Sequence, residues 1–504
     1  MFSNRRILSA AGLALLLLAA SSCATREERV AAERDRCGDI IGFWRVTYDG
    51  PGRSPSSLKW IDVDDDGDLI TRLHVELKWN IFMQTDDDEI SWEHDSIAFW
   101  DEFTGRMLDD RETIRLTYTG FNGKQHPFVM NRLRDADTIR LLRDVYASRS
   151  AGADLLPVPD LRDGLRVGSF HACGIDSLPF AALVQEIHAG DYGDIHCLLM
   201  SVDDTLFLEE YFGAGGQLHG PAVASFLRRT HHQVQSVSKS MLSAVTGVAC
   251  DSGLLPPVST PVAELLPEYA SLLAEKKRDI TLHHLLAMNT GLTWNESGVS
   301  LGDSTNDIHR MHTRRDPSAY VLSRPLRTLP GRAFVYNSGC YHVVQEIIDR
   351  HVGTTTGELA FHALFAPMGC DSLPWEKGGA PHIRARDLWR LGSLVLHDGA
   401  WQGRQLISRD WVARSTANQQ HPDQTAYGYF WWPQRYHVQG DTMHAVAAIG
   451  SGGQYLLLFP ELDFIALVLA GNYEEHYGTR LRKVMETVVL PAVRGRGAAQ
   501  LAGK

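Results

Sequence analysis

Two pairs of apolar strands, far apart along the chain, constrain the fold of this sequence more than any other feature. Residues 195–201 and 205–212 are apolar runs separated by two aspartates, a pattern that predicts a tight hairpin. A second pair, 455–459 and 464–469, lies near the end of the chain, and long helical segments lie between the two pairs. We therefore expect an α+β domain in which the terminal strands meet in one antiparallel sheet, flanked by helices and a helical subdomain.

A different pattern fills residues 40–147. Leu73, Val75 and Leu77 alternate with polar residues, which is the period of a half-buried strand. Polar turns separate several such runs, and five tryptophans fall among them: Trp44, Trp60, Trp79, Trp92 and Trp100. We expect a small all-β domain here, either a barrel or a sandwich. Gly152 and nearby prolines mark residues 148–162 as the linker to a second domain at 163–494.

The first 23 residues have the pattern of an export signal. Arg5 and Arg6 precede the apolar run 7–20, which is too short to span a bilayer comfortably. The small residues before Cys23 resemble the lipobox of bacterial lipoproteins, so we expect a protein of the bacterial cell envelope, anchored to a membrane by a lipid on Cys23 and facing the periplasm or exterior. Ordinary signal-peptidase cleavage is the alternative. Residues 24–39 then form a charged tether, and 495–504 a flexible tail.

Length and composition exclude several classes of protein. The 504 residues suffice for two or three domains with sizeable cores. Lys and Arg number 49 against 61 Asp and Glu, so the formal charge of -12 gives no attraction to phosphate backbones, and we expect no nucleic-acid partner. The cysteines beyond Cys23 have neither zinc-site spacing nor the density of a disulfide framework: Cys37, Cys173, Cys197, Cys250, Cys340 and Cys370.

The strongest chemical signal is the tetrapeptide Ser236-Val237-Ser238-Lys239, which opens an apolar run that continues to Ala249. Because the run is apolar almost all round, we expect a buried helix. Ser236 and Lys239 then lie one turn apart on one face, and the backbone N–H groups of the helix N-terminus can polarise a carbonyl. A lysine amine can activate a serine only when it is neutral, a form that burial favours. This motif predicts a serine nucleophile with a lysine base.

The stretch 235–240 resembles the nucleophile motif of the serine β-lactamase and penicillin-binding protein superfamily, especially its class C β-lactamase-like esterases and amidases. Three further stretches resemble motifs of that family in the same order: its helix-to-loop segment at 280–292, its Tyr-x-Asn element at 330–338, and its Lys-Thr-Gly strand at 448–454. The resemblance covers residues 163–493. It implies that Tyr336 shares a proton with the serine and the lysine.

Two positions depart from the pattern of the family. Ser338 stands in place of an asparagine that contacts the substrate's amide side chain, and Ala448 in place of a lysine that holds the carboxylate of β-lactams and peptides. Both changes resemble the branch of esterases and 6-aminohexanoate-dimer hydrolases, whose substrates are esters or small linear amides. The resemblance also places Ser338 and Gly450 beside the substrate. It makes the N–H groups of Ser236 and Ser451 the two oxyanion donors.

The implied function is hydrolysis of a small-molecule ester or amide through an acyl-enzyme on Ser236, with Lys239 and Tyr336 as general base and acid. This chemistry requires no metal and no organic cofactor. Two alternatives stay open. One is a D-alanyl-D-alanine carboxypeptidase or a β-lactamase, and the other is a non-catalytic ligand-binding or sensor module.

Three other patterns point to chemistry less strongly. Residues 298–302 match the nucleophile elbow of α/β-hydrolases, but a polar loop precedes them where a strand is required. Residues 62–67 copy half of a calcium loop, yet Leu73 replaces the bidentate glutamate, so we expect a hairpin turn. His309 and His312 have the spacing of metal ligands without the glutamate of a zinc protease.

Overall fold

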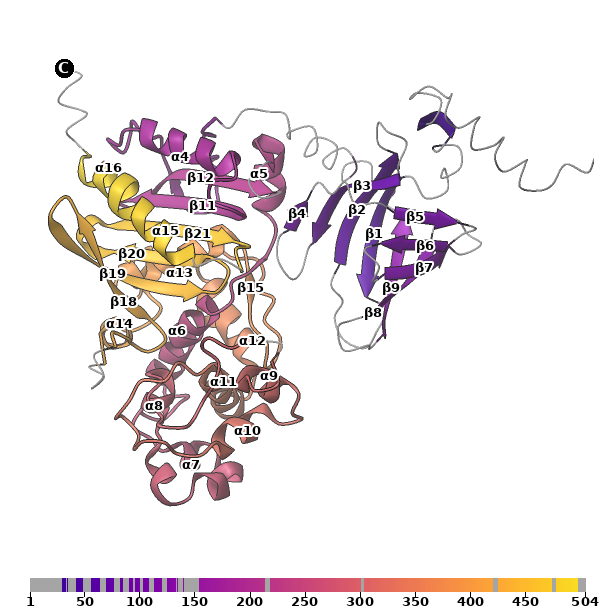
Figure 1. The fold of residues 1–504 in the computed structure, drawn as a ribbon. Coiled ribbons are helices and arrows are strands. Elements are labelled where there is room, and N and C mark those ends of the chain that lie inside the picture. Colours follow the sequence, from indigo (N-terminus) through magenta and orange to yellow (C-terminus); the bar gives the residue numbers. More distant parts are fainter. Residues whose placement is uncertain are drawn as a thin grey trace, which may run out of the picture. The chain divides into compact units, whose positions relative to one another are not determined.

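The structure is a computed structural model that divides into two compact units, residues 1–147 and 148–504 (Figure 1). It describes residues 154–213, 218–300, 303–419, 425–473 and 477–496, and in the first unit chiefly nine β-strands. Cys23, the export segment and the last residues of the chain lie outside this description. Lipid attachment and cellular location therefore stay predictions of the sequence.

The first unit is an antiparallel sheet, as the alternating pattern predicts. Its strands are β1 (Gly42–Tyr48), β2 (Ser56–Val63), β3 (Leu69–Glu76), β4 (Phe82–Gln84), β5 (Ile90–Glu93), β6 (Ser96–Phe99), β7 (Phe103–Met107), β8 (Thr113–Thr119) and β9 (Gln125–Arg132). Their order is β4-β3-β2-β1-β9-β8-β7-β6-β5, so the first strand pairs with the last. β3 and β5 also lie close together, which shows that the sheet curves round on itself. The half calcium motif joins β2 to β3, which pair as a hairpin.

The second unit is built on a larger sheet. Its strands are β10 (Arg166–Val167), β11 (Ile195–Val202), β12 (Thr205–Gly213), β13 (Leu218–His219), β18 (Trp432–Val438), β19 (Asp441–Gly450), β20 (Gln454–Phe459) and β21 (Phe464–Ala470). The order is β10-β12-β11-β21-β20-β19-β18, with β13 on β12. Four short strands of the unit form two separate ladders: β14 (His232–Gln233) with β15 (His382–Ile383), and β16 (Ala400–Trp401) with β17 (Arg404–Gln405).

Both predicted hairpins of the large sheet are present. Between β11 and β12, Asp203 and Asp204 have φ values of +48° and +57°, the backbone of a two-residue hairpin turn that aspartate tolerates. β20 and β21 form the second hairpin, and β21 pairs antiparallel with β11, with Leu198 opposite Val468. The predicted meeting of the terminal strands in one sheet is therefore confirmed.

Helices cover both faces of this sheet (Figure 1). They are α4 (Leu178–His188), α5 (Pro221–Leu227), α6 (Val237–Asp251), α7 (Val262–Leu265), α8 (Leu282–Leu286), α9 (Asp307–His312), α10 (Pro317–Ser323), α11 (Gly339–Val352), α12 (Thr356–Ala360), α13 (Ala385–Leu396), α14 (Arg409–Thr416), α15 (Tyr477–Val484) and α16 (Leu490–Arg494). Short 3₁₀ and π turns complete the set: η2 (Pro267–Leu273), η3 (Glu275–Asp279), η4 (Phe361–Phe365), η5 (Pro460–Leu462) and η6 (Met485–Val489).

The main apolar core lies between the sheet and the first and last helices of the unit, α4 and α15–α16. It includes buried residues of α4, of η6 and α16, and of the strands: Phe180, Val184, Leu457, Phe464, Met485 and Leu490. The other face packs against α13 and α6, and α7 to α12 form the predicted helical subdomain beyond α6. This is the α+β arrangement that the sequence predicts.

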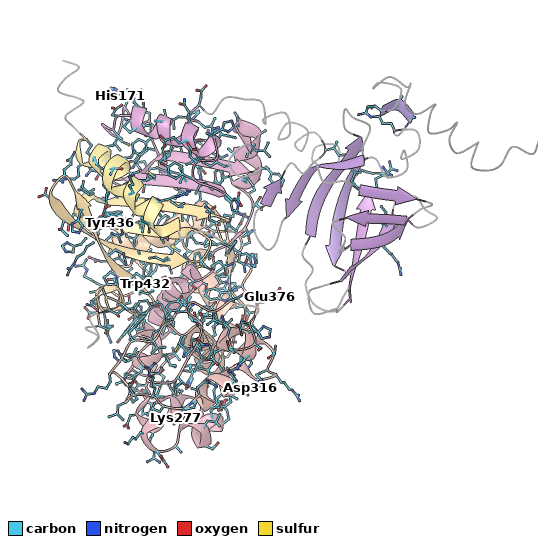
Figure 2. The ribbon with its side chains drawn as sticks, in the orientation of Figure 1. His171, Lys277, Asp316, Glu376, Trp432 and Tyr436 are labelled. Carbon is cyan, nitrogen blue, oxygen red and sulfur yellow. The ribbon has the colours of Figure 1, made fainter. Side chains whose placement is uncertain are left out.

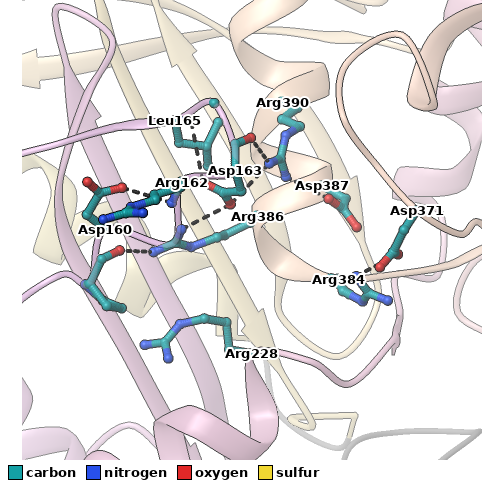
Figure 3. Close-up of polar contacts among 12 residues, drawn as sticks. Asp160, Arg162, Asp163, Leu165, Arg228, Asp371, Arg384, Arg386, Asp387 and Arg390 are labelled. Carbon is teal, nitrogen blue, oxygen red and sulfur yellow. Dashed lines mark hydrogen bonds and ion pairs between the residues drawn. The ribbon is translucent and has the colours of Figure 1, made fainter.

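Buried charges fasten the segment that enters the second unit (Figure 3). Arg386 of α13 is 3% exposed and donates to Glu209 of β12, to Asp163 and to the carbonyl of Pro159. Arg390, one turn later, donates to the carbonyl of Asp163. Burial alone would raise the pKa of Asp163, but the two arginines outweigh it and lower that pKa. The chain from Pro159 to Asp163 is therefore fixed to the sheet and to α13.

The described residues contain no helix that is both long and apolar enough to cross a bilayer. Their five cysteines are free thiols, of which Cys197, Cys340 and Cys370 are buried. Within the same part of the chain, no three His, Cys, Asp or Glu side chains are grouped to hold a metal ion.

Candidate active site

The predicted nucleophile and base lie at the start of α6. Ser236 is the residue before the helix, and Lys239 Nζ, one turn later, donates to Ser236 Oγ at 2.8 Å. Lys239 is 6% exposed, and residues 237–249 are all buried, as the apolar run predicts. Gln235 has a φ of +50°, which is uncommon for a residue other than glycine, and it turns the chain into the helix. A serine and a lysine are thus held in hydrogen-bond contact by one helical turn.

Tyr336 joins this pair through its ring. Lys239 Nζ lies 5.1 Å from the ring centroid of Tyr336 and 5.9 Å from that of Tyr341. An ammonium group is attracted to the face of an aromatic ring at such distances. Trp432, at the start of β18, stacks on Tyr336 with centroids 6.0 Å apart and planes 22° from parallel. Figure 2 shows Trp432 where the sheet meets the helical part of the unit. The structure therefore brings Ser236, Lys239 and Tyr336 together.

Gly450, the last residue of β19, lies against the chain that leads to the nucleophile. A Cβ at this position would come 2.6 Å from the carbonyl oxygen of Val234 and 3.1 Å from the Cβ of Gln235. Only glycine allows the strand to approach the backbone so closely. Ser451 follows immediately and is exposed. Ser236 and Ser451 thus lie on two segments in direct contact, the arrangement that a two-donor oxyanion hole requires.

Ser338 is held by a carboxylate of the loop before α9. Its N–H donates to Glu296 Oε2 at 2.7 Å, and its hydroxyl donates to Glu296 Oε1 at 2.9 Å. Trp294 Nε1 donates to Glu296 Oε2 as well. Ser338 directly precedes α11, where a negative charge is favourable beside the N-terminal N–H groups. Glu296 therefore fixes the turn two residues after Tyr336, and the hydroxyl proton of Ser338 is already engaged.

Ala448 faces the helix that carries the nucleophile. Residues alternate along β19, and Ala447 belongs to the apolar core on the opposite face of the sheet. Ala448 is fully buried, on the side where β19 packs against α6. A buried methyl group therefore stands on the strand where the family carries a cation.

Burial also sets the protonation of the groups around the amine. It raises the pKa of Tyr341 well above its usual value. It lowers the pKa of His342 to about 4, and a positive charge on His312 or Lys239 would act in the same direction. Burial and the nearby carboxylate of Glu296 raise the pKa of Cys340. Around neutral pH, Tyr341, His342 and Cys340 are therefore uncharged neighbours of Lys239.

Sequence reasoning missed Glu296, because a lone acid in a polar loop carries no motif. The one available signal is its place, directly after the helix-to-loop segment 280–292. The sequence analysis also missed Tyr473. Its hydroxyl accepts a hydrogen bond from Gln235 Nε2 at 3.0 Å, next to the nucleophile. Of the weaker candidates, Ser300 lies in a loop, and its carbonyl oxygen accepts a hydrogen bond from the side-chain amide of Asn306. His312 packs its ring on His342, 5.4 Å away.

Comparisons with known proteins show several that are similar to this chain. A 6-aminohexanoate-dimer hydrolase of Paenarthrobacter ureafaciens is 27% identical over 291 residues, which is 52% of this chain and 69% of that protein. Among solved structures, a family VIII carboxylesterase has a TM-score of 0.47 and 16% identity over 61% of this chain and 97% of its own. An octameric penicillin-binding protein homologue from Pyrococcus abyssi has a TM-score of 0.48 and 14% identity over 63% and 78%.

A family model described as Beta-lactamase matches residues 198–486. That range contains α6 with Ser236 and Lys239, the turn with Tyr336, and the end of β19. Because the match covers more than half of the sequence, the chain belongs to the beta-lactamase family.

Proposed function

We propose that this protein is a serine hydrolase that cleaves a small ester or amide through an acyl-enzyme on Ser236. The observation that carries the proposal is the 2.8 Å hydrogen bond between Lys239 Nζ and Ser236 Oγ, in a buried setting that includes the ring of Tyr336. A buried amine beside a serine hydroxyl is the arrangement of a nucleophile with its base. Membership of a hydrolase family supports the same reaction class.

The chemistry proceeds in two halves. Ser236 Oγ attacks the carbonyl carbon while its proton passes to the Lys239–Tyr336 pair, and the N–H groups of Ser236 and Ser451 stabilise the oxyanion. The pair then protonates the leaving group, which departs as an alcohol or amine. Water attacks the acyl-enzyme in the second half, giving its proton to the same pair, and the carboxylic acid leaves as Ser236 is restored.

Two features favour a substrate without a carboxylate next to the scissile bond. Ala448 offers only a methyl group on the strand beside α6, so this position supplies no cation to hold a carboxylate. The hydroxyl proton of Ser338 is donated to Glu296 and is not available to an amide side chain of the substrate. Esters and small linear amides fit these conditions better than β-lactams or D-alanyl peptides.

The test is intact-mass spectrometry after reaction with a fluorophosphonate, which phosphonylates activated serines. We expect one adduct that maps to Ser236, is absent in Ser236→Ala and forms at least about 100-fold more slowly in Lys239→Ala. Ser243→Ala is the matched control, because Ser243 is a fully buried serine of the same helix. It should be labelled like the parent. A folded parent that takes no label would contradict the proposal and favour a binding or sensor module.

A second measurement, on the parent protein before any labelling, tests the substrate class. We expect turnover of p-nitrophenyl acetate or butyrate and of a small linear amide, with no turnover of nitrocefin and no covalent labelling by benzylpenicillin. Nitrocefin turnover or penicillin labelling at Ser236 would instead identify a β-lactamase or a D-alanyl-D-alanine carboxypeptidase.

A further inference from the structure

Behind the candidate oxyanion hole, two buried histidines and a carboxylate form a continuous chain of hydrogen bonds. His196 Nε2 lies 2.9 Å from Asp194 Oδ2, and His196 Nδ1 lies 2.8 Å from His232 Nε2. His232 Nδ1 lies 2.7 Å from the carbonyl oxygen of Gln233. His196 and His232 are 2% and 1% exposed. Neither histidine has a part in the chemistry proposed for Ser236.

The carbonyl at one end fixes the direction of every hydrogen bond in this chain. A carbonyl only accepts, so His232 Nδ1 carries a proton and donates it to Gln233. His232 Nε2, on the neutral ring, then accepts, and His196 Nδ1 must donate to it. At the far end an ionised carboxylate also only accepts, so His196 Nε2 must donate to Asp194. His196 therefore needs protons on both nitrogens, one more than a neutral imidazole has.

The surroundings place this additional proton on His196. Burial lowers the pKa of His232 to about 3, and the neighbouring His196 acts in the same direction, which keeps His232 neutral. The side chain of Asp194 is 22% exposed, so water helps to keep it ionised next to an imidazolium. The other titratable groups nearby are His382 on β15, opposite Gln233, and Tyr473 in the segment after β21.

The same chain connects the two backbone segments that form the oxyanion hole. One end binds the carbonyl of Gln233, three residues before Ser236. At the other end, the carbonyl of Asp194 accepts from Gly471 N–H at 2.7 Å, and a Cβ on Gly471 would lie 2.1 Å from Asp194 Oδ2. The next residue, Asn472, donates its N–H to the carbonyl of Gly452 at 3.0 Å, directly after Ser451.

We propose that Asp194, His196 and His232 are positioning residues whose chain, held together by an imidazolium on His196, keeps the Ser236 and Ser451 segments at their catalytic separation. The positioning role rests on the function proposed above, whereas the protonation state does not. A neutral His196 would have one ring proton for two acceptors, Asp194 Oδ2 and His232 Nε2. One hydrogen bond of the chain would then be missing, and the support of the oxyanion hole would weaken.

Asp194→Asn is the informative variant. An amide N–H at this position donates to His196 Nε2, so all three hydrogen bonds can form with two neutral rings. The matched control is Glu210→Gln. Glu210 lies 2.7 Å from His219 Nε2 in an acid–histidine pair that is fully buried, but His219 Nδ1 has no hydrogen-bond partner among the described residues, so one ring proton suffices for that pair.

The first readout is the ¹H–¹⁵N spectrum of the full-length protein labelled in its histidine rings, at pH 7.5. We expect one slowly exchanging imidazolium in the parent and in Glu210→Gln, and none in Asp194→Asn. The same imidazolium count in the parent and in Asp194→Asn would overturn the proposal. Because this measurement needs no enzymatic activity, it tests the hydrogen-bond chain independently of the proposed function. The proposed function fails separately, if Ser236 takes no fluorophosphonate.

The second readout is turnover of p-nitrophenyl butyrate. We expect Asp194→Ala to lower kcat by about 10-fold to 100-fold with KM within about twofold, because the oxyanion donors are displaced but substrate contacts remain. Asp194→Asn should stay within about threefold of the parent at pH 7.5. An Asp194→Ala enzyme that melts like the parent and keeps its kcat would overturn the positioning role.

Discussion

The two sides of the candidate nucleophile are each held by one carboxylate, but the two carboxylates work differently. On the tyrosine side, Glu296 accepts from the N–H and hydroxyl of Ser338 and from Trp294. On the oxyanion side, Asp194 faces the ring of His196. Glu296 is satisfied by donors that carry a proton at every ordinary pH. The hydrogen-bond chain that includes Asp194 is complete only when both ring nitrogens of His196 carry a proton.

This difference teaches that hydrogen-bond direction, and not only proximity, decides how a support responds to pH. The donors on Glu296 are an amide, a hydroxyl and an indole, none of which titrates in the ordinary range. The chain from Asp194 ends on a carbonyl and therefore has to hold a fixed number of protons. We therefore expect the support of the oxyanion side, unlike that of the tyrosine side, to depend on the number of protons on His196.

The largest loss of activity should come from Gly450→Ala, which changes the contact between β19 and the nucleophile segment directly. The new Cβ would lie 2.6 Å from the carbonyl oxygen of Val234, so the strand or the nucleophile segment must shift. A misplacement of about 1 Å in an active site can cost about 100-fold, so we expect kcat to fall by about that factor. Ester turnover measures it. Thr442→Ala, at the other end of β19, is the control, because Thr442 is exposed and its substitution adds no atom to the strand. If both variants lose kcat equally, Gly450 does not position the oxyanion hole.

The tyrosine side is tested by Glu296→Gln. An amide has one accepting oxygen in place of two and presents N–H groups to a donor, so at least one of the three hydrogen bonds is lost, at a cost of about 1–3 kcal/mol. We expect kcat to fall about tenfold, with little change in KM, because Tyr336 loses its fixed position.

Asp303→Asn is the matched control for Glu296→Gln. Asp303 is an exposed carboxylate of the same loop and, among the described residues, accepts hydrogen bonds only from Thr305. Its substitution should leave ester turnover within about twofold of the parent. An Asp303→Asn enzyme as slow as Glu296→Gln would show that the whole loop, and not the contact to Ser338, sets the position of Tyr336.

Acid should destabilise both sides alike. Burial lowers the pKa of His342, beside Lys239, to about 4 and that of His232, on the oxyanion side, to about 3. Both are neutral in the folded protein, whereas the unfolded chain protonates them below about pH 6.5. Their contribution to stability is therefore complete above about pH 6.5 and is lost as the pH falls toward 4, by at most about 1.4 kcal/mol per pH unit for each ring.

Urea unfolding at pH 6.5 and pH 4.5 measures this loss of stability. His342→Gln should reduce the change in the free energy of unfolding between these two pH values, because an amide takes no proton. His171→Gln, at an exposed histidine, should leave that change as it is in the parent. An equal loss of stability in His342→Gln and in the parent would mean that His342 is not held neutral in the folded protein.

The smallest effect should come from Trp432→Leu. Trp432 stacks on the ring of Tyr336. Aromatic stacking is worth about 0.5–1.5 kcal/mol, so we expect a rise of about threefold in the KM for p-nitrophenyl butyrate with kcat nearly unchanged. A fall in kcat as large as that of Glu296→Gln would instead make Trp432 a support of Tyr336.

Much of the fold could be predicted because its signals are local. The alternation along residues 69–76 and the two aspartates between β11 and β12 act through the nearest neighbours in the chain. The closure of the sheet between β11 and β21 followed from apolar strands at both ends, since such strands bury their faces only by pairing. The curvature of the first sheet, where β3 nears β5, carries no local signal.

By itself the sequence determined the pair at the start of α6, because Ser236 and Lys239 are one helical turn apart and any helix brings them together. Only the tertiary structure decided what surrounds this pair. Glu296 reaches Ser338 across 42 positions, and His196 reaches His232 across 36. Neither pair shares a helix or a strand, so no periodicity links its members. Such contacts depend on how the elements pack, and the energy of packing is spread over the whole core.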